Sequence, residues 1–411
     1  MAGSLSIELG DRKAEFAATR ERFRLPDGVI YLDGNSLGPL PKGVAERLAT
    51  VVDDEWGRML IRAWNDAGWI DLPARVGDRI GKLIGASPGS VMVADSTSVN
   101  LYKALAASLK LRADRHVILS DTGNFPTDLY MAQGLIGTLG SGYELKMVAP
   151  EEVADALDDT VAALMLTEVD YRTGRLHDMR ALTAIAHDVG ALAIWDLAHS
   201  AGALPVHVGV AGADFAVGCG YKYLNGGPGA PAFIYVKPEL AERIDPDLSG
   251  WMGHESPFAF EHHYRPAGGG GRMRVGTPAL LSLAALDAAL DVWDDVVIET
   301  VRAASIELGD LLIDEVERRC GRHGLALASP RDGSRRGSQV SFRFEHGYAA
   351  MQALIAHGVI GDFRAPDLMR FGITPLYVGE QDIVAAVEKL EAVLKGRLWD
   401  RSEFKRRAKV T

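Results

Sequence analysis

Short, almost wholly apolar runs recur through the middle of the chain and alternate with longer stretches of helical periodicity. Such runs are typical of strands buried on both faces, as in a parallel sheet covered by helices. Between them, residues 179–190 have apolar residues at helical spacing and end near a glycine suited to a left-handed cap. The alternation predicts α/β units around a largely parallel sheet. The runs expected to be strands are residues 116–121, 161–169, 191–196, 214–220 and 231–236.

The rest of the chain predicts a second, smaller unit. Residues 265–278 contain four consecutive glycines, which favours an irregular, mobile loop. A long helical pattern follows over residues 278–296 and suits a connection between two domains. The next segments predict helix, strand and helix, as in a small α+β domain: residues 306–324, 338–346 and 348–358. The basic end of the chain, residues 401–411, is expected to be a solvated terminus.

Charge and cysteine content argue against several classes of function. The 411 residues include 44 Lys and Arg against 55 Asp and Glu, a formal charge of −11. Nucleic acid and anionic membranes require a basic face, so we expect neither as the principal partner. The two cysteines cannot build a disulfide framework, and no window reaches the roughly 18 apolar residues of a spanning helix. The first residues also lack signal-peptide order, so a cytoplasmic protein is expected.

Several common cofactor motifs do not fit the sequence. No G-x-G-x-x-G string follows a strand, and the histidines within residues 254–263 lack H-E-x-x-H spacing. The string GDRIGK, residues 77–82, is one residue short of a P-loop and follows no convincing strand, so an ordinary helix is expected there. A dinucleotide, a triphosphate bound by a P-loop and a catalytic zinc are therefore disfavoured.

Polar residues follow two neighbouring predicted strands, at the point where each strand ends. Asp196 and His199 follow one strand, and Tyr221 and Lys222 follow the next. The carboxyl ends of strands in an open α/β sheet meet at one edge. A lone lysine is usually a solvated surface group, and an Asp at a strand end is often a helix cap. Here the lysine follows a small apolar strand and precedes GGPG, and partial burial can lower a lysine's pKa and make it a nucleophile.

An acid and a lysine at adjacent strand ends are the groups that pyridoxal phosphate requires. The lysine holds the aldehyde as an imine, and the carboxylate keeps the pyridine nitrogen protonated. The phosphate needs an anion-binding turn, and Ser96, Thr97 and Ser98 directly precede a helical pattern. Hydroxyls and free N–H groups at a helix start bind phosphate, although the same string alone more often serves as an N-cap. Beside Asp196 and Lys222, the string favours a phosphate site.

Five segments carry a resemblance to a known family: YLDGNSLGPLP (31–41), DSTSVNL (95–101), NFPTD (124–128), WDLAHSAGALPVH (195–207) and GYKYLNGGPGAPAF (220–233). In this order they resemble kynureninase, a pyridoxal-phosphate enzyme family with the aspartate-aminotransferase fold. The resemblance implies an α/β protein of pyridoxal-phosphate fold type I, with a mostly parallel sheet, helices on both of its faces and a smaller α+β domain. It divides the chain into an N-terminal arm with part of the small domain, a large cofactor-binding domain and a C-terminal small domain: residues 1–50, 51–285 and 286–411.

The resemblance implies a role for each matching residue. Lys222 is expected to be the Schiff-base lysine and Asp196 the partner of the pyridine nitrogen. The phosphate is expected to bind Thr97, Ser98 and Tyr221. The residues expected at the ring and its hydroxyl are Phe125, which stacks on the ring, Asp128, Thr167 and His199. Trp251 and Thr277 are expected to reach the site from a partner subunit, which implies an obligate homodimer.

Two further residues concern the substrate. Arg370, in LMRFGITPLY, matches the arginine that binds the substrate's α-carboxylate, a task that suits a bidentate guanidinium. Trp64 is either part of the wall around the substrate's aromatic ring or an ordinary core tryptophan. The implied reaction is hydrolytic Cβ–Cγ cleavage of L-kynurenine, with 3-hydroxy-L-kynurenine as a second substrate, to anthranilate or 3-hydroxyanthranilate and L-alanine in tryptophan catabolism. Animal members that prefer the hydroxylated substrate carry an amide at the position of Thr277, so the threonine favours L-kynurenine.

Other classes remain as alternatives. Tyr221, with the phosphate, is the candidate acid/base group that assists water addition to the ketone. A cysteine desulfurase-like lyase needs a reactive cysteine on a mobile loop, whereas Cys219 lies in a predicted strand and Cys320 in a helical pattern. An aminotransferase is compatible with the same residues, and a keto acid would reveal it as a new amino acid. A cofactor-free scaffold or a pyridoxal-responsive regulator is a different class, and residues 1–30 are too short for a regulator's DNA-binding module.

Overall fold

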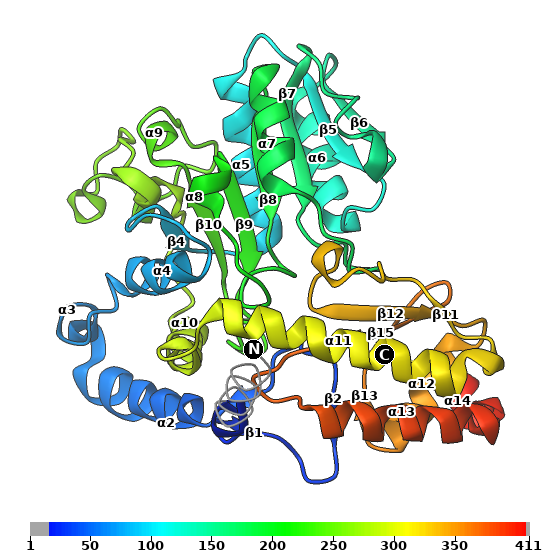
Figure 1. The fold of residues 1–411 in the computed structure, drawn as a ribbon. Helices are drawn as coiled ribbons and strands as arrows, with labels where there is room; N and C mark the ends of the chain where they lie inside the picture. The colour runs from blue at the N-terminus through cyan, green and yellow to red at the C-terminus, as the bar shows by residue number, and fades with distance from the viewer. Residues whose placement is uncertain (1–15, 408–411) are drawn as a thin grey trace, which may run out of the picture.

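A large sheet dominates the computed structural model, which describes residues 16–407 (Figure 1). All five runs predicted to be strands belong to it, together with two strands that were not predicted, β4 and β6. The strands are β4 (Val91–Val93), β5 (Val117–Asp121), β6 (Glu144–Val148), β7 (Val161–Thr167), β8 (Leu192–Asp196), β9 (Phe215–Cys219) and β10 (Ala232–Val236). Within the described residues their order is β4-β10-β9-β8-β7-β5-β6.

One strand runs against the others. The strands from β6 to β9 pair in parallel, whereas β10 pairs antiparallel with both β9 and β4. The prediction that residues 231–236 join a parallel arrangement is therefore wrong for this strand. A parallel connection needs a crossover of about a dozen residues or more, usually a helix. The segment between Cys219 and Ala232 contains no helix and turns back at the sheet edge. Apolar periodicity indicates that a strand is buried but not in which direction it runs.

Helices cover both faces of this sheet, as predicted. Along β7, Leu164 and Leu166 belong to one apolar cluster and Ala163 and Met165 to another, because alternate side chains point to opposite faces. Residues of α4 and α7 join the first cluster and residues of α5 join the second. The helices of this part of the chain are α4 (Leu72–Leu83), α5 (Thr97–Leu111), α6 (Pro126–Leu139), α7 (Met179–Asp188), α8 (Val208–Ala211) and α9 (Pro238–Ala241).

Local sequence signals explain where several of these helices begin and end. Ser96 caps α5, and its hydroxyl accepts a hydrogen bond from the Val99 N–H at 3.4 Å. Asp178 caps α7 in the same way, and Gly190 just beyond the helix has a φ of +82°, as expected from the sequence. The string GDRIGK lies inside α4, which confirms an ordinary helix rather than a P-loop.

A second sheet lies at the other end of the molecule (Figure 1). It is antiparallel and has the order β11-β12-β15-β14, with strands Ala326–Leu327, Gln339–Arg343, Leu368–Gly372 and Asp362–Arg364. Its helices are α11 (Ile298–Cys320), α12 (Gly347–Ala356), α13 (Glu380–Lys395) and α14 (Ser402–Lys405). In the N-terminal part, β2 (Ile30–Tyr31) pairs with β13 (Val359–Ile360), and β1 (Phe23–Arg24) pairs with β3 (Leu40–Pro41). The N-terminal segment thus packs beside the C-terminal elements, while the exact domain boundaries stay predictions.

The segments between the two sheets differ in part from expectation. The helical pattern over residues 278–296 does form helices, but it is divided into α10 (Leu280–Ala289) and a short 3-10 helix (Leu290–Trp293), after which α11 begins at Ile298. Before α10 the chain forms α2 (Gly43–Thr50), a π-helix (Val51–Met59) and α3 (Ala63–Asp66) in the N-terminal part. Between residues 16 and 407, no helix has both the length and the apolarity needed to cross a membrane.

The glycine-rich stretch is more regular than expected. It contains a 3-10 helix (Gly269–Met273) whose Arg272 and Met273 are buried. Arg272 donates a hydrogen bond to the Ile244 carbonyl at 2.9 Å, and the Met273 carbonyl accepts one from Lys103 at 2.7 Å. The expectation of an irregular loop is therefore wrong for residues 269–273, because two buried cations bind this segment to helix α5 and to the chain after α9. The predicted basic terminus lies partly outside the described residues, from residue 408 onward.

Candidate functional site

The loops after β8 and β9 bring the predicted polar residues together. Lys222 Nζ lies 3.0 Å from His199 Nε2, although these residues are separated by a crossover between two strands. The ammonium also lies over the ring of Tyr221, 5.8 Å from its centroid. Lys222 and Tyr221 are half-buried, and His199 is buried. The convergence expected at the carboxyl edge of the sheet is therefore present.

His199 is held in its neutral form. Burial lowers the pKa of His199 well below its ordinary value, and the positive charge of Lys222 lowers it further. A neutral imidazole can accept a hydrogen bond from the Lys222 ammonium at Nε2, which places the imidazole proton on Nδ1. Nδ1 is buried and forms no hydrogen bond of regular geometry within the described chain, although the Gln339 side chain interacts with His199 and opposes the fall in its pKa. Buried polar atoms normally have a hydrogen-bond partner. A buried nitrogen without one is therefore a candidate for contact with a ligand.

Two buried carboxyl groups lie beside this pair. Asp196 ends β8, and its Oδ1 accepts a hydrogen bond from the Ala198 N–H at 2.8 Å. Asp128 lies in the first turn of α6, and its buried Oδ2 forms no hydrogen bond of regular geometry in the described residues, although its carboxyl group interacts with that of Asp196. Burial raises the pKa of both groups, repulsion by Asp196 raises that of Asp128 further, and Lys222 lowers that of Asp196. Asp128 therefore holds a proton and Asp196 carries the negative charge.

The predicted phosphate-binding residues lie at the start of α5. Ser96 is the cap, and Thr97 and Ser98 are the first helical residues, so the helix begins two positions earlier than expected. N–H groups in a first turn have no partner within the helix, and the helix dipole favours an anion there. The hydroxyls of Thr97 and Ser98 add two further donors. This end of α5 can therefore hold a phosphate without a basic patch.

Phe125 and Thr167 complete the surroundings of the strand ends. Phe125 precedes α6, is 40% exposed and packs edge-to-face on Tyr171 at 5.0 Å between ring centroids. Its exposed ring is free to stack on a flat ligand. Thr167 ends β7, is buried and donates a hydrogen bond to the Val169 carbonyl at 3.1 Å. The sequence predicted both residues but not Tyr171, which fixes the orientation of the phenyl ring.

Arg370 lies in β15 at the centre of a buried charged cluster. Its Nε donates to Asp362 Oδ1 at 2.8 Å, and its Nη2 donates to Asp362 Oδ2 and, at 2.9 Å, to Ser36 Oγ. Its Nη1 donates to the Tyr171 carbonyl at 2.5 Å. Four of its five N–H groups thus have partners inside the described chain. A bidentate grip on a substrate carboxylate would require such a carboxylate to displace Ser36.

The neighbours of Arg370 were missed by sequence reasoning. Burial opposes ionisation of Asp362, but Arg370 and Arg364 outweigh it and lower the Asp362 pKa, with Arg364 Nη2 at 2.8 Å from Oδ2. Asp33, in the YLDGNSLG segment, has its pKa raised to about 7 by burial and by the charge of Asp362. A signal for the pair was available: Asp362 and Arg370 lie at equal spacing on either side of Pro366, as cross-strand partners in a hairpin do.

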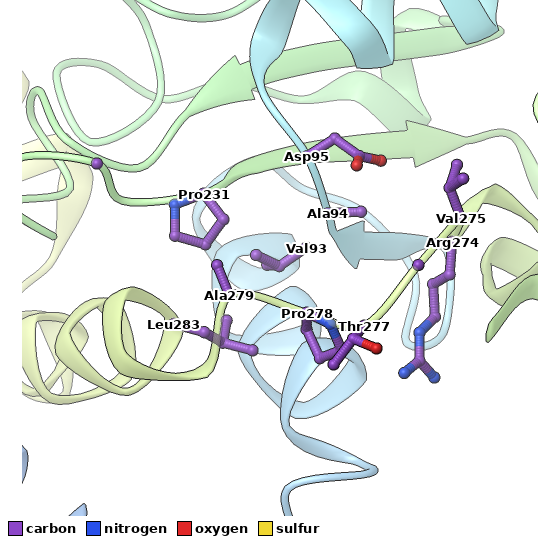
Figure 2. Close-up of a pocket in the computed structure, with 12 residues that line it drawn as sticks. Val93, Ala94, Asp95, Pro231, Arg274, Val275, Thr277, Pro278, Ala279 and Leu283 are labelled. Carbon is purple, nitrogen blue, oxygen red and sulfur yellow. The ribbon is translucent and has the colours of Figure 1, made fainter. Parts of the chain in front are cut away.

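Three predicted residues do not join the site within this chain. Trp64 lies in α3, packs edge-to-face on Trp69 at 6.1 Å and contacts the apolar core, which favours its core interpretation. Trp251 is 39% exposed and stacks on Phe260 at 6.4 Å. Thr277 lines a cavity of about 240 Å³. Figure 2 shows this cavity between Asp95, at the turn before α5, and the segment that carries Thr277.

The arrangement at the sheet edge fits pyridoxal phosphate. It provides a lysine amine at Lys222, an anionic carboxylate at Asp196 for a protonated ring nitrogen, and the start of α5 for a phosphate. The buried atoms His199 Nδ1 and Asp128 Oδ2, which form no hydrogen bond of regular geometry in the described residues, lie among these groups. Gly123 has no room for a side chain, because an added Cβ would lie 2.8 Å from Asp170 Oδ2. The turn before Phe125 therefore packs closely against the Asp170 side chain.

Comparison with known proteins agrees with these observations. The family model described as the kynureninase C-terminal domain matches residues 301–390. Similar curated proteins include the kynureninases of Pseudomonas fluorescens and Burkholderia pseudomallei (strain 1106a). They are 50% and 49% identical to this chain over 406 residues, which cover 98% of the chain and 98% of each relative.

Solved structures share the fold at much lower identity. A C-DES variant with glycine covalently linked to its PLP cofactor has a TM-score of 0.78 at 18% identity and covers 90% of this chain and 98% of its own. The cysteine desulfurase CsdA of Escherichia coli has a TM-score of 0.77 at 20% identity and covers 92% and 98%. These two structures support pyridoxal-phosphate fold type I, and the full-length identity to the curated relatives shows that the chain belongs to the kynureninase family.

Proposed function

We propose that this chain is a kynureninase that uses pyridoxal 5′-phosphate to cleave the Cβ–Cγ bond of L-kynurenine by hydrolysis, releasing anthranilate and L-alanine. The observation that carries the proposal is the convergence of Lys222, neutral His199 and the buried Asp196 carboxylate at one sheet edge. It occurs in a chain that is half identical to kynureninases over nearly its full length. We place the reaction in tryptophan catabolism and in the cytoplasm.

The residues that hold the cofactor follow from the site. Lys222 would bind the aldehyde of the cofactor, Asp196 would pair with its pyridine nitrogen, and Phe125 would stack on its ring. The phosphate would bind Thr97 and Ser98 at the start of α5 and Tyr221 after β9, and Thr167, Asp128 and His199 would complete the ring contacts. When bound, pyridoxal phosphate supplies an aldehyde that condenses with amines and a protonated ring that withdraws electrons from the substrate's Cα.

Two residues of the chain move protons in the proposed reaction. The amine of Lys222 would accept the proton from the substrate's Cα. His199 beside it is neutral and therefore does not repel the positive charge that the lysine then carries. Burial raises the pKa of Tyr221, so its phenol stays protonated at neutral pH. It therefore acts as a hydrogen-bond donor and acid toward the ketone oxygen while water adds to Cγ. Exclusion of bulk water by the buried floor of the site strengthens both interactions.

Substrate binding involves the arginine cluster. Arg370 has one unengaged N–H group, at Nη1, and Ser36 Oγ on Nη2 is replaceable by a carboxylate oxygen. Arg364 is 35% exposed at its side chain and adds positive charge next to Arg370. The α-carboxylate of an amino acid is the anion that this cluster is suited to bind. Asp362 holds the guanidinium plane of Arg370 in place for that contact.

A homodimer completes the site in this proposal. Trp251, Phe258 and Phe260 form an exposed aromatic cluster, with Phe258 57% and Phe260 74% exposed. Exposed aromatic side chains in contact with one another mark an association surface. We propose that a second copy covers this cluster and that Trp251 and Thr277 contact the cofactor of the partner subunit. The threonine at position 277 favours L-kynurenine over its 3-hydroxy form.

A cysteine desulfurase is the alternative that the solved structures raise, and the cysteines of this chain disfavour it. Cys219 and Cys320 are both buried. Burial raises the pKa of Cys219 and raises that of Cys320 to about 12. A nucleophilic cysteine is exposed and has a lowered pKa instead. Neither thiol can therefore take up sulfur from a substrate in the described conformation.

The proposal is tested with purified protein, pyridoxal phosphate and L-kynurenine. We expect anthranilate fluorescence to rise with time, and a parallel assay with 3-hydroxy-L-kynurenine to give the lower kcat/KM. Lys222→Ala should lose both the absorbance of the lysine-bound cofactor and turnover, whereas Lys110→Ala, on the exposed face of α5, should retain both. Full activity in Lys222→Ala would refute the proposed mechanism. Formation of a new amino acid from an added keto acid, without anthranilate, would identify an aminotransferase.

A further inference from the structure

The turn between β4 and α5 has an unusual backbone conformation. Asp95 has a φ of +49°, in the left-handed region that residues other than glycine rarely adopt. The next residue, Ser96, caps α5, and the N–H groups of Thr97 and Ser98 follow directly. These groups have no partner within the helix. The position of the start of α5 relative to β4, and with it that of these N–H groups, therefore depends on the conformation of Asp95.

A buried lysine holds this turn from behind. Lys103 lies about two helical turns along α5 and is 5% exposed. Its Nζ donates to Asp95 Oδ2 in a short contact, to Asn100 Oδ1 at 3.1 Å and to the Met273 carbonyl at 2.7 Å. An ammonium has three N–H groups, so all of them are used inside the chain. Burial lowers the pKa of Lys103, but the carboxylate of Asp95 opposes this effect.

The backbone on both sides of Asp95 is also held. Asn100 is fully buried, and its Nδ2 donates to the Ala94 carbonyl at 2.7 Å. The Ala232 N–H of β10 donates to the Asp95 carbonyl at 3.0 Å. With both carbonyls bound, the side chain of Asp95 is the remaining part of the turn that needs a partner, and Lys103 is that partner.

The same lysine connects the turn to a distant segment. Met273 ends the glycine-rich 3-10 helix, and the chain continues from it through Arg274 to Thr277. Figure 2 shows Arg274 and Thr277 around the cavity that Asp95 also lines. Lys103 thus binds both the turn that leads into α5 and the segment that the proposed dimer presents to the partner subunit.

We propose that Lys103 is a positioning residue of the cofactor site: its ammonium holds Asp95 in the left-handed conformation and so directs the donors of Thr97 and Ser98 toward the phosphate. The inference rests on the proposed function, because the phosphate concerned is that of pyridoxal phosphate. Lys103 does not itself touch the phosphate, since its three N–H groups are engaged by the chain. Its contribution is to the affinity for the cofactor rather than to the chemistry at Cα.

The test measures binding of pyridoxal phosphate to the apoprotein by absorbance titration, without substrate. Lys103→Met removes all three donors while keeping a long apolar side chain. Since hydrogen bonds to charged groups are the strong ones, we expect its Kd for pyridoxal phosphate to rise about tenfold or more. At saturating pyridoxal phosphate, kcat should fall by less than about threefold, because no group at the reacting atoms has changed. Lys110→Met is the matched control: it lies on the same helix, is exposed and pairs with Asp247 at 3.0 Å, and its Kd should match the parent's.

A rescue variant separates positioning from a general structural role. Glycine adopts a positive φ freely. Combining Lys103→Met with Asp95→Gly therefore removes both the unpaired carboxylate and the cost of holding a positive φ at residue 95. This double variant should bind the cofactor at least about threefold more tightly than Lys103→Met alone. Absence of this recovery would overturn the inference.

Other outcomes decide the matter even if Lys103→Met does not fold. Asp95→Asn keeps the shape of the turn and weakens the same contact, so its Kd should rise in the same direction. Unchanged affinity in Asp95→Asn, or in a folded Lys103→Met, would also overturn the inference, whatever the effect on thermal stability. A parent protein that binds pyridoxal phosphate but leaves L-kynurenine intact would refute the proposed function alone.

Discussion

The substitution Asp362→Asn probes the buried arginine cluster most directly. Asp362 and Arg370 are each 1% exposed, and Oδ2 of Asp362 accepts from Arg370 Nη2, from Arg364 Nη2 at 2.8 Å and from Ser36 Oγ at 2.7 Å. An asparagine keeps the shape but removes the charge, and an amide nitrogen at the position of Oδ2 would face three donors. Arg370 would then be a buried cation without its counter-charge.

The size of the effect follows from burial. Removing one partner of a fully buried ion pair costs about 3–5 kcal/mol, because the other charge is left unpaired. The half-buried Arg364 adds about 1 kcal/mol or less, since water screens it. We therefore expect the free energy of unfolding to fall by about 3–5 kcal/mol, a large share of the roughly 5–15 kcal/mol of a native protein. The kcat/KM for L-kynurenine should fall as well, because Arg370 loses its fixed orientation.

Urea denaturation of the holoprotein at one fixed concentration, followed by circular dichroism, measures the change. The matched control is Asp367→Asn in the same hairpin, which pairs with Arg343 at 3.2 Å between half-exposed side chains and should alter stability by about 0.5 kcal/mol or less. A fall in the free energy of unfolding of less than about 1 kcal/mol for Asp362→Asn would refute the reasoning, because removing one partner of a buried ion pair should be strongly destabilising.

The pH dependence of the same variant provides an independent check. The pKa of Asp362 is lowered in the folded state, so its ionisation stabilises the protein above the unfolded-state pKa of about 3.9. That contribution is lost as the pH falls through the lower folded-state pKa. The stability difference between the parent and Asp362→Asn should therefore be largest near neutral pH and should shrink below about pH 4. A difference that stays constant down to pH 3 would contradict the charge argument.

Three further predictions concern the reaction. Asp128→Asn should keep at least about a tenth of the parental kcat/KM, because Asp128 is already neutral. Asp196→Asn should lower kcat/KM by about a hundredfold or more. Equal losses in the two variants would show that the proton does not reside on Asp128. Tyr221→Phe should lower kcat at saturating pyridoxal phosphate by about 10²–10⁴-fold, the range for a lost acid/base group, and an unchanged kcat would exclude the phenol. Mixing inactive Trp251→Ala and Lys222→Ala proteins should recover about a quarter of the parental anthranilate formation through hybrid dimers that carry one intact site, and no recovery would place Trp251 in its own subunit's site.

The strands and the covering helices could be predicted because the pattern of apolar residues within each segment indicates which of its faces are buried. The runs at residues 116–121 and 161–169 are apolar throughout, and both became strands covered on two faces. The direction of β10 could not be predicted, because it depends on how the loop after Lys222 returns to the sheet. The short edge strands β4 and β6 were not predicted either, because β4 has only three residues and β6 is partly exposed, so neither forms a long apolar run.

The candidate site was predicted in part for a similar reason. Asp196 and Lys222 end adjacent strands, so the topology alone predicts that they meet. The neutral state of His199 depends on burial by residues distant in sequence, and no local pattern encodes it. The partners of Arg370 lie in β14, in the YLDGNSLG segment and after β7, three parts of the chain that meet only when the two sheets pack together.

By itself, the sequence determined the α/β architecture and the family, and it predicted that the lysine and carboxylate proposed for the cofactor site would meet, because apolar periodicity, strand ends and specific segments are properties of residue order. The tertiary structure alone decided which groups are charged and which are held. Asp128 is protonated because it lies beside Asp196 in a buried position. Asp362 forms a buried ion pair with Arg370, and Lys103 forms an ion pair with Asp95. These states depend on desolvation and on distances of a few ångström between remote residues, and only packing sets either quantity.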